Sequence, residues 1–318
     1  MSSQLVDINA DGHNDILVGS FSGVPQLILG NKDGYNQPEP ILDADGETVL
    51  IEAFWNQEES KWDDTNRANS KGHCTSVAAV DWDDDGDLDI LLGDYYGGRL
   101  FVRMNDGSAK KARFSKVNQP VMSGGDPVVI KNGLSAPRVV DWDGDGLFDI
   151  LCGGSKGGVF LFRNRGKQAL PEFASVVTLI APIKGQPSAF IKQVESVDGL
   201  PTLPGSSFHI DPVDYDGDGD LDLIVGARSQ WLNENVKVLT KEENQKVASL
   251  EEQQSSLMEE YQALEAQNRT EEELKVHFQS AEAKELLNQL SKVAQQLRTL
   301  KPNPTSSGDF VWLFRRKD

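Results

Sequence analysis

A short acidic pattern, repeated four times, constrains the fold of this chain more than any other feature of its sequence. The pattern D-x-[DN]-x-D-G-x-x-D-[IL] occurs in VDINADGHNDILVG (6–19), VDWDDDGDLDILLG (80–93), VDWDGDGLFDILCG (140–153) and DYDGDGDLDLIVG (214–226). Carboxylates this close to one another repel unless a cation lies between them. The pattern therefore predicts four cation-binding turns.

We number the positions of each loop from its first aspartate, so loops 1 to 4 are residues 7–15, 81–89, 141–149 and 214–222. Positions 1, 3 and 5 can direct side-chain oxygens at one centre, and the glycine at position 6 permits the sharp turn. Position 7 offers its backbone carbonyl, and an aspartate at position 9 closes the set. A hard divalent cation such as Ca²⁺ prefers such a group of oxygens. The helix-loop-helix calcium hand is excluded, because position 12 lacks its glutamate and holds Val18, Leu92, Cys152 and Val225.

Short apolar segments flank each loop and are typical of β-strands. QLV, SVAAV, APRVV and HIDPV precede the loops, and DILVG, DILLG, DILCG and DLIVG follow them. Third strands are expected in GVPQLILGN, GGRLFVRMN and GGVFLFRNRG, and weaker fourth strands near ARFSKVNQPV and EFASVVTLI. Four antiparallel strands per repeat are typical of a propeller blade. The prediction is a mainly β fold, a β-propeller with four recognisable blades that forms a small ring or part of a larger one.

A long polar segment interrupts the last repeat. Its apolar residues recur at spacings of three and four, which predicts an inserted α-helical coiled-coil hairpin. The expected seam consists of Val247, Leu250, Leu257, Tyr261, Leu264, Leu287, Leu290, Ala294 and Leu297. Thr270 and Glu273 form a capping-box pattern for the second helix, and Pro302 and Pro304 should end it. The expected domains are the blades (1–236), the hairpin (237–304) and a strand that completes the last blade (305–318).

The charge of the chain limits the kinds of partner that it can bind. The net charge is −19 and the isoelectric point is near 4.6, which argues against nucleic acid as a partner. Of the 50 acidic residues, 18 lie in the four loops.

No apolar run is long enough for a membrane span, and this chain carries no visible export signal. Cys74 and Cys152 are expected to be small buried residues, although a single bridge between them stays open.

These loops, with their strands, resemble the calcium loops of the FG-GAP/VCBS repeat family, whose blades also occur in integrin α-subunit heads. The resemblance covers residues 1 to about 235 and 306–318, and it implies up to four bound Ca²⁺ ions. The family usually closes a larger ring, so the resemblance favours further blades upstream in a longer parent. The implied ligands, with position 7 acting through its carbonyl, are Asp7, Asn9, Asp11, His13 and Asp15 in loop 1; Asp81, Asp83, Asp85, Asp87 and Asp89 in loop 2; Asp141, Asp143, Asp145, Leu147 and Asp149 in loop 3; and Asp214, Asp216, Asp218, Asp220 and Asp222 in loop 4.

The function expected from this resemblance is a non-catalytic binding or adhesion module, extracellular, on the cell surface or periplasmic, with a protein or carbohydrate partner. A propeller-scaffold enzyme (hydrolase or lyase) and a structural subunit docked through the hairpin are the alternatives. Catalysis needs a constellation of groups, and the four histidines (His13, His73, His209 and His277) are scattered. The aromatic residues at position 2, Trp82, Trp142 and Tyr215, are expected to pack between blades.

Overall fold

The computed structural model describes residues 2–51, 54–56, 61–63, 74–95, 97–131, 133, 136–183, 193–232, 239–265, 280–301 and 305–316. The chain divides into two units. One consists of Met1–Trp231 together with Ser307–Asp318, and the other is Leu232–Ser306.

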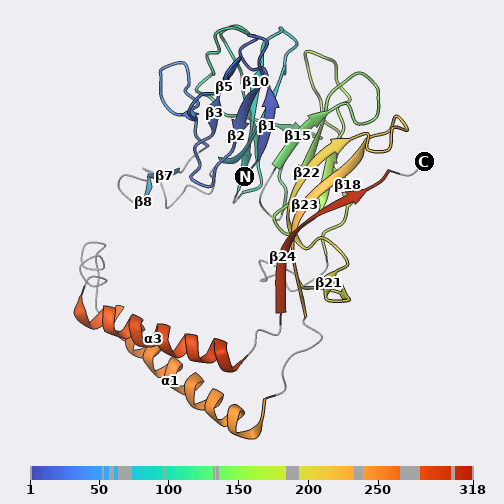
Figure 1. Ribbon diagram of the computed structural model, residues 1–318. Helices are drawn as coiled ribbons and strands as arrows, with labels where there is room; N and C mark the ends of the chain where they lie inside the picture. The colour runs from blue at the N-terminus through green and yellow to red at the C-terminus, as the bar shows by residue number, and fades with distance from the viewer. Residues whose placement is uncertain are drawn as a thin grey trace. The chain divides into compact units, whose positions relative to one another are not determined.

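The first unit contains four larger sheets among its described residues, and we call them blades 1 to 4 (Figure 1). Blade 1 is β1 (Ser3–Val6), β2 (Asp15–Val18), β3 (Gln26–Ile28) and β6 (Glu39–Pro40). Blade 2 is β9 (Cys74–Val80), β10 (Asp89–Asp94), β11 (Leu100–Arg103) and β12 (Gln119–Pro120). Blade 3 is β15 (Ala136–Val140), β16 (Asp149–Gly153), β17 (Val159–Phe162) and β18 (Val177–Ile180). Blade 4 contains β22 (Ser206–Val213), β23 (Asp222–Leu232) and β24 (Thr305–Phe314). The predicted four-bladed, mainly β architecture is confirmed.

Blade 4 departs from the other three in its outer strands. Its third strand, β24, pairs with β23 although the two are separated in sequence by the second unit. A short strand, β19 (Gln193–Val194), adds in parallel to the far end of β23. The remaining strands form two-residue or three-residue pairs: β4 (Gly30–Asn31) with β5 (Gly34–Tyr35), β7 (Phe54–Asn56) with β8 (Lys61–Asp63), β13 (Met122–Ser123) with β14 (Asp126–Pro127), and β20 (Ser196–Val197) with β21 (Leu200–Pro201).

The strand pairs around the acidic loops share one register. In each blade the valine before the loop pairs with the aspartate at position 9: Val6 with Asp15, Val80 with Asp89, Val140 with Asp149 and Val213 with Asp222. Each loop is therefore the connection of an antiparallel hairpin, as the flanking apolar segments predict. The same register makes the loops directly comparable position by position.

The hydrophobic cores lie between neighbouring blades. Leu17 of blade 1 and Ile90 of blade 2 share one core, Leu91 of blade 2 and Ile150 of blade 3 share the next, and a third joins blades 3 and 4. Consecutive residues of a strand point to opposite faces, so β10 sends alternate side chains into two cores. All six residues of β10 are buried. This explains why the strand after each loop is continuously apolar.

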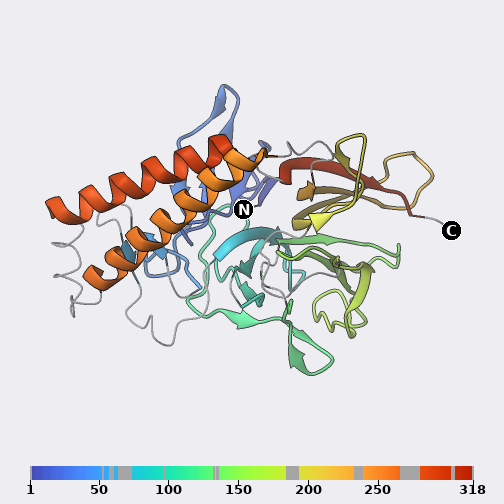
Figure 2. The same cartoon turned by 90° about the horizontal axis from the view of Figure 1, so that it is seen from below.

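The inner strands lie side by side in the order β1, β9, β15 and β22, and Figure 2 shows the four blades from below. Between β1, β15 and β22 lies a cleft of about 800 Å³, lined among others by Leu5, Arg138, His209 and Val311. Leu5 is 62% exposed and Val311 is 77% exposed. The first and last blades thus each leave apolar side chains uncovered.

The second unit consists of two helices among its described residues, α1 (Lys241–Glu265) and α3 (Ala281–Leu300). Thr240 and Glu243 form a capping box at the start of α1, with hydrogen bonds of 3.2 and 2.9 Å in the two directions. Ser280 caps α3 by accepting a hydrogen bond from the backbone N–H of Ala283. The expected capping pair Thr270 and Glu273 lies outside the described residues.

The residues of α3 that contact α1 differ in part from the predicted seam. Leu250 and Leu257 of α1 pack against α3 as expected, but Leu287 is 42% exposed. The seam of α3 instead includes Leu286, Leu290, Val293 and Leu297. Adjacent leucines at 286 and 287 each fit the three-and-four spacing, so the spacing alone did not fix which of them faces the partner helix. Within the described residues, no helix has the length and apolarity that a membrane crossing requires.

Candidate functional site: the acidic loops

The aspartate at position 1 organises the backbone of every loop. Its carboxylate accepts a hydrogen bond from the backbone N–H of the glycine at position 6, and the N–O distances are 2.8 Å in loop 1, 3.1 Å in loop 2, 2.9 Å in loop 3 and 3.1 Å in loop 4. The glycines have φ values of 89°, 90°, 87° and 96°, in the region that other residues rarely adopt. The predicted role of this glycine in the turn is confirmed.

The aspartate at position 5 is held by the backbone as well. Its Oδ1 accepts a hydrogen bond from the N–H of position 7 at 2.9 Å in each loop, whether that residue is His13, Asp87, Leu147 or Asp220. Since the donor is the backbone, the side chain at position 7 is free to vary. Two of the expected ligand carboxylates are therefore fixed by the loop itself.

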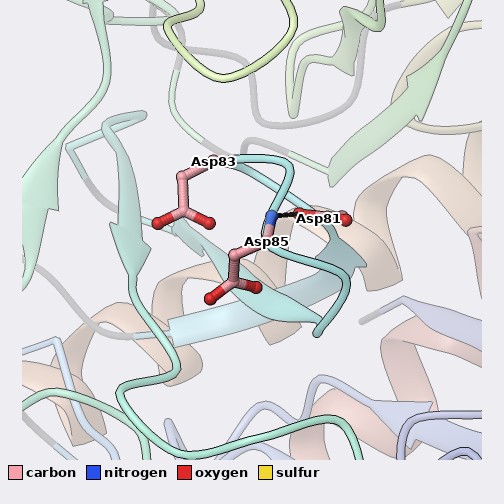
Figure 3. A group of neighbouring side chains, drawn as sticks. All are labelled: Asp81, Asp83 and Asp85. Carbon is pink, nitrogen blue, oxygen red and sulfur yellow. Dashed lines mark hydrogen bonds between the residues drawn. The ribbon is translucent and has the colours of Figure 1, made fainter.

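Three of the four loops bring carboxylates together. Ligand oxygens lie within 4.8 Å of one another in the groups Asp81–Asp83–Asp85, Asp141–Asp143–Asp149 and Asp214–Asp216–Asp218. Figure 3 shows the first group, in which Asp83 and Asp85 direct their carboxylates to the same side of the loop. In loop 1 the side-chain nitrogen of Asn9 donates to Asp11 at 3.1 Å. The atoms that could coordinate a metal in these groups are all carboxylate oxygens. Such a ligand set fits Ca²⁺ and does not fit a metal that prefers nitrogen or sulfur.

The aspartate at position 9 has a structural role that sequence reasoning missed. Its side chain is buried in every loop, and one oxygen accepts the N–H of position 2 at 3.0 Å in loop 1, 2.9 Å in loop 2, 3.1 Å in loop 3 and 3.3 Å in loop 4. The other oxygen accepts the N–H of a residue just beyond the third strand: Gly30, Asn105, Asn164 or Arg316. Position 9 thus ties the loop to the third strand of its blade, and only Asp149 also belongs to a group of converging carboxylates.

Burial changes the proton affinity of these carboxylates. Desolvation is the main cause that raises the pKa of Asp89 to about 6, and it also raises the pKa of Asp149. The pKa values of Asp83 and Asp87 are raised too, first by burial and then by the charge of Asp85 nearby. The direction is that expected for carboxylates that are partly buried and lie beside other carboxylates.

The aromatic residues at position 2 pack between blades where a following blade exists. Trp82 lies 5.5 Å from Phe148 and 5.8 Å from Phe173 between ring centroids, and both phenylalanines belong to the blade 3 region. Trp142 is buried in the core shared with blade 4. Tyr215 is 57% exposed, so the expectation was wrong for this residue. No further blade covers it among the described residues, and Arg315 lies over its ring instead.

Position 4 carries a backbone requirement that the repeated pattern does not reveal. Gly144 and Gly217 have φ values of 74° and 75°, and the corresponding Ala10 and Asp84 have φ values of 51° and 60°. All four residues therefore adopt the left-handed conformation, which strains a residue with a side chain. The glycine signal in loops 3 and 4 was present in the sequence, but the alanine and aspartate in the other two loops concealed it.

Arginines approach the carboxylates of loops 3 and 4. Arg163 and Arg165 lie 3.6 and 3.8 Å from Asp143, at position 3 of loop 3. In loop 4, Arg315 is 3.3 Å from Asp216, and Arg316 is 3.4 Å from Asp220. These arginines come from the ends of the third strands, far along the chain from the carboxylates that they approach, so no local pattern linked them to the loops.

Cys152 and His209 have different surroundings in the first unit. Cys152 is a buried free thiol between blades 2 and 3, as expected for a small core residue, and burial raises its pKa. The side chain of Cys74 and all of His73 and His277 lie outside what the structure describes. His209 lines the cleft, and its pKa is lowered to about 4, mainly by burial and further by the charge of Arg138. Such a histidine is neutral at physiological pH.

The four blades and their repeated acidic hairpin loops place this structure in the class of repeat-containing β-propellers. The comparison with protein families agrees with this class, because residues 81–152 and 141–225 each match the model of the FG-GAP-like repeat. Residues 81–225 of this chain are therefore similar to FG-GAP-like repeats. No curated protein matches the chain.

Proposed function

We propose that this chain is a calcium-binding β-propeller that acts as a non-catalytic binding or adhesion module in an extracellular, cell-surface or periplasmic setting. The observation that carries the proposal is the convergence of carboxylates in loops 2, 3 and 4 on frames fixed by the same backbone hydrogen bonds. FG-GAP-like repeats fit a binding role. The all-oxygen donor set supports Ca²⁺ as the ion.

The proposed ligands are the side chains at positions 1, 3, 5 and 9 and the carbonyl at position 7, with up to four ions in total. A bound cation supplies positive charge that offsets the repulsion between neighbouring carboxylates, and so stabilises the blade. Because position 9 already accepts two backbone hydrogen bonds, its remaining oxygen lone pairs are those available to an ion. Loop 1 has Asn9 in place of a carboxylate, so its affinity should be lower.

The partner proposed for the module is a protein or a carbohydrate. Docking through the helical hairpin is the second candidate, favoured by the 42% exposure of both Met258 in α1 and Leu287 in α3. Exposed apolar residues on otherwise polar helices are available for contact with a partner. A pull-down with the full chain, compared with a chain carrying Met258→Lys and Leu287→Lys, tests this candidate, because only a partner held by the hairpin would be lost.

Thermal melting tests the calcium proposal. The full chain is melted in Ca²⁺, in Mg²⁺ and in chelator, and calcium should raise the midpoint most. An ion at 100 times its dissociation constant adds about 2.7 kcal/mol per site. Asp218→Asn in loop 4 should reduce the response, whereas Asp126→Asn, an exposed acid outside the loops, should retain it. Equal midpoints under all three conditions would contradict the proposal.

A further inference from the structure

The third strand of blade 4 has a free edge. In blades 1 to 3 the third strand lies between two partners: β3 pairs with β2 and β6, β11 with β10 and β12, and β17 with β16 and β18. In blade 4, β24 pairs with β23 (Figure 2), and none of the described strands pairs with its other edge. The unpaired backbone groups of such an edge are a template for pairing with another chain.

Backbone hydrogen bonds in blade 2 show which residues of blade 4 face the free edge. Arg316 in blade 4 corresponds to Asn105 in blade 2, because both donate a backbone N–H to the aspartate at position 9. In blade 2, the carbonyls of Leu100 and Met104 accept N–H groups from the outer part of the blade. Alternate residues of a strand direct their backbone groups to the same edge. The corresponding residues in blade 4 are Asp309, Val311, Leu313 and Arg315.

The side chains of these four residues follow a fixed order on one face of the sheet. All four residues are exposed, and alternate residues of a strand share a face. Val311 is 77% exposed and Leu313 is 39% exposed. Asp309 adds a negative charge at one end, and Arg315 adds a positive charge at the other. The order along the edge is therefore acid, apolar, apolar, base.

This order is self-complementary when two copies of β24 run antiparallel. A two-fold axis at Trp312 places Asp309 opposite Arg315 of the second copy, and Val311 opposite Leu313 of the second copy. Opposed residues of this kind exchange backbone N–H···O bonds in both directions. Opposite charges and apolar side chains in such cross-strand pairs add stability. A shift of the register by two residues would place Arg315 opposite Val311 or Ser307 and would remove the pairs of opposite charge.

Both charged residues are accessible for this contact. No lysine or arginine in the described part of the chain forms an ion pair with Asp309. The guanidinium of Arg315 lies 3.3 Å from Asp216 and 5.9 Å from the ring centre of Tyr215, but the Arg315 side chain is still 57% exposed. Exposed ion pairs contribute little affinity each. The backbone bonds and the apolar pairs therefore supply most of the affinity, and the charges select the register.

We propose that two copies of this chain associate through β24, in an antiparallel pair that joins their fourth blades into one continuous sheet. The contact is isologous, because the same residues lie on both sides of the two-fold axis. The second copy thus occupies the edge that a fourth strand covers in blades 1 to 3. This inference does not depend on the proposed calcium function.

Sedimentation equilibrium of the full chain at about 0.15 M salt tests the association, because the Debye length of about 8 Å limits the repulsion between two acidic molecules. The wild type should show a monomer–dimer equilibrium. Leu313→Pro removes an N–H from the free edge and leaves the bonds to β23 in place, so it should raise the dissociation constant of the dimer about tenfold or more. The matched control Leu313→Val keeps the N–H and an apolar side chain, and should stay within about threefold of the wild type. Melting curves show whether both variants fold.

Charge variants test the register. Asp309→Arg places two arginines opposite each other in a homodimer, and Arg315→Asp places two aspartates opposite each other, so each variant alone should dissociate at a concentration where the wild type is dimeric. An equimolar mixture of the two variants should form dimers again, because every charged pair then joins an arginine to an aspartate. A monomeric wild type, a dimer that survives Leu313→Pro in a folded protein, or two charge variants that stay monomeric when mixed would overturn the proposal.

Discussion

The left-handed residue at position 4 permits a quantitative test of how the loops are built. Ala10 is exposed and has a φ of 51°, and in loop 3 the equivalent residue is Gly144 with a φ of 74°. A Cβ atom at Gly144 or Gly217 would meet no atom within 4 Å. The backbone conformation is therefore the only cost of a side chain at this position, and steric overlap adds nothing to it.

We expect Ala10→Gly to raise the free energy of unfolding by about 0.5–1 kcal/mol. Relief of left-handed strain contributes about 1–2 kcal/mol, and the larger entropy of glycine in the unfolded chain offsets part of this gain. Gly144→Ala should lower the free energy of unfolding by a similar amount. Asp84→Gly should gain less than Ala10→Gly, because aspartate tolerates this conformation better than alanine. For a unit of this size, the shift in melting temperature is about 1–4 °C.

The measurement is urea denaturation in chelator, followed by tryptophan fluorescence and circular dichroism, so that ion binding does not contribute. The slope with urea should stay constant while the midpoint moves. The double variant Ala10→Gly with Gly144→Ala should lie close to the wild type, because the two loops are far apart in sequence and belong to different blades. A destabilised Ala10→Gly protein, or a Gly144→Ala protein with an unchanged midpoint, would refute this account of position 4.

Three further outcomes are expected. Asp149→Asn places an amide N–H₂ group against a backbone N–H and should lower the free energy of unfolding, measured by denaturant titration in chelator, by about 1–3 kcal/mol. The control Asp145→Asn changes an exposed carboxylate and should lower it far less. Equal losses in the two variants would argue against the structural role of position 9. In chelator, a His209→Asn protein should melt at a higher temperature as the pH falls from 7 towards 5, because the folded state raises the pKa of Asp89 to about 6 and so binds a proton that the unfolded state does not. The His209→Asn background removes an opposite contribution, since the pKa of His209 is lowered to about 4 and its unfolded imidazole takes up a proton that the folded one does not. The stabilisation from Asp89 is lost as the pH rises through 6, and in calcium the trend should reverse, because protons compete with the ion. Replacement of residues 237–301 by a short glycine-containing turn should preserve the calcium response and most of the melting temperature, since closure entropy changes slowly with loop length; a variant that only aggregates in calcium would show that the helices belong to the core.

The sequence was most informative where the structural signal is local. The aspartates and glycine of each loop, with apolar segments on both sides, correctly predicted the hairpins, and GDFVWLFRR correctly predicted a third strand in blade 4 beyond the helices. In these cases the pattern and the hydrogen bonds that it forms lie within a few residues of each other. The glycine at position 6 belongs to this group, because its conformation is required by its own loop.

The features that escaped prediction depend on contacts between distant segments. Arg163 reaches Asp143 only because the end of β17 lies beside loop 3, and the second hydrogen bond of each position 9 aspartate depends on the same proximity. Tyr215 has the sequence context of Trp82 and Trp142 but lacks a neighbouring blade to cover it. The choice between Leu286 and Leu287 depends on the rotation of α3 about its own axis, which the spacing of apolar residues leaves undetermined.

The hydrogen bond between the backbone N–H of Arg316 and Asp222, at 2.8 Å, has a mechanical consequence. Ser307 of β24 lies near Arg228 of β23, in the half of the strand pair closer to the helical insertion, and Arg316 lies near Asp222 at the other end. Force applied through the helical insertion enters at the end near Ser307 and separates the two strands one hydrogen bond at a time. Loop 4 is hydrogen-bonded to the opposite end of the pair. This contact is therefore the last to open, and it resists separation of β24 from the blade.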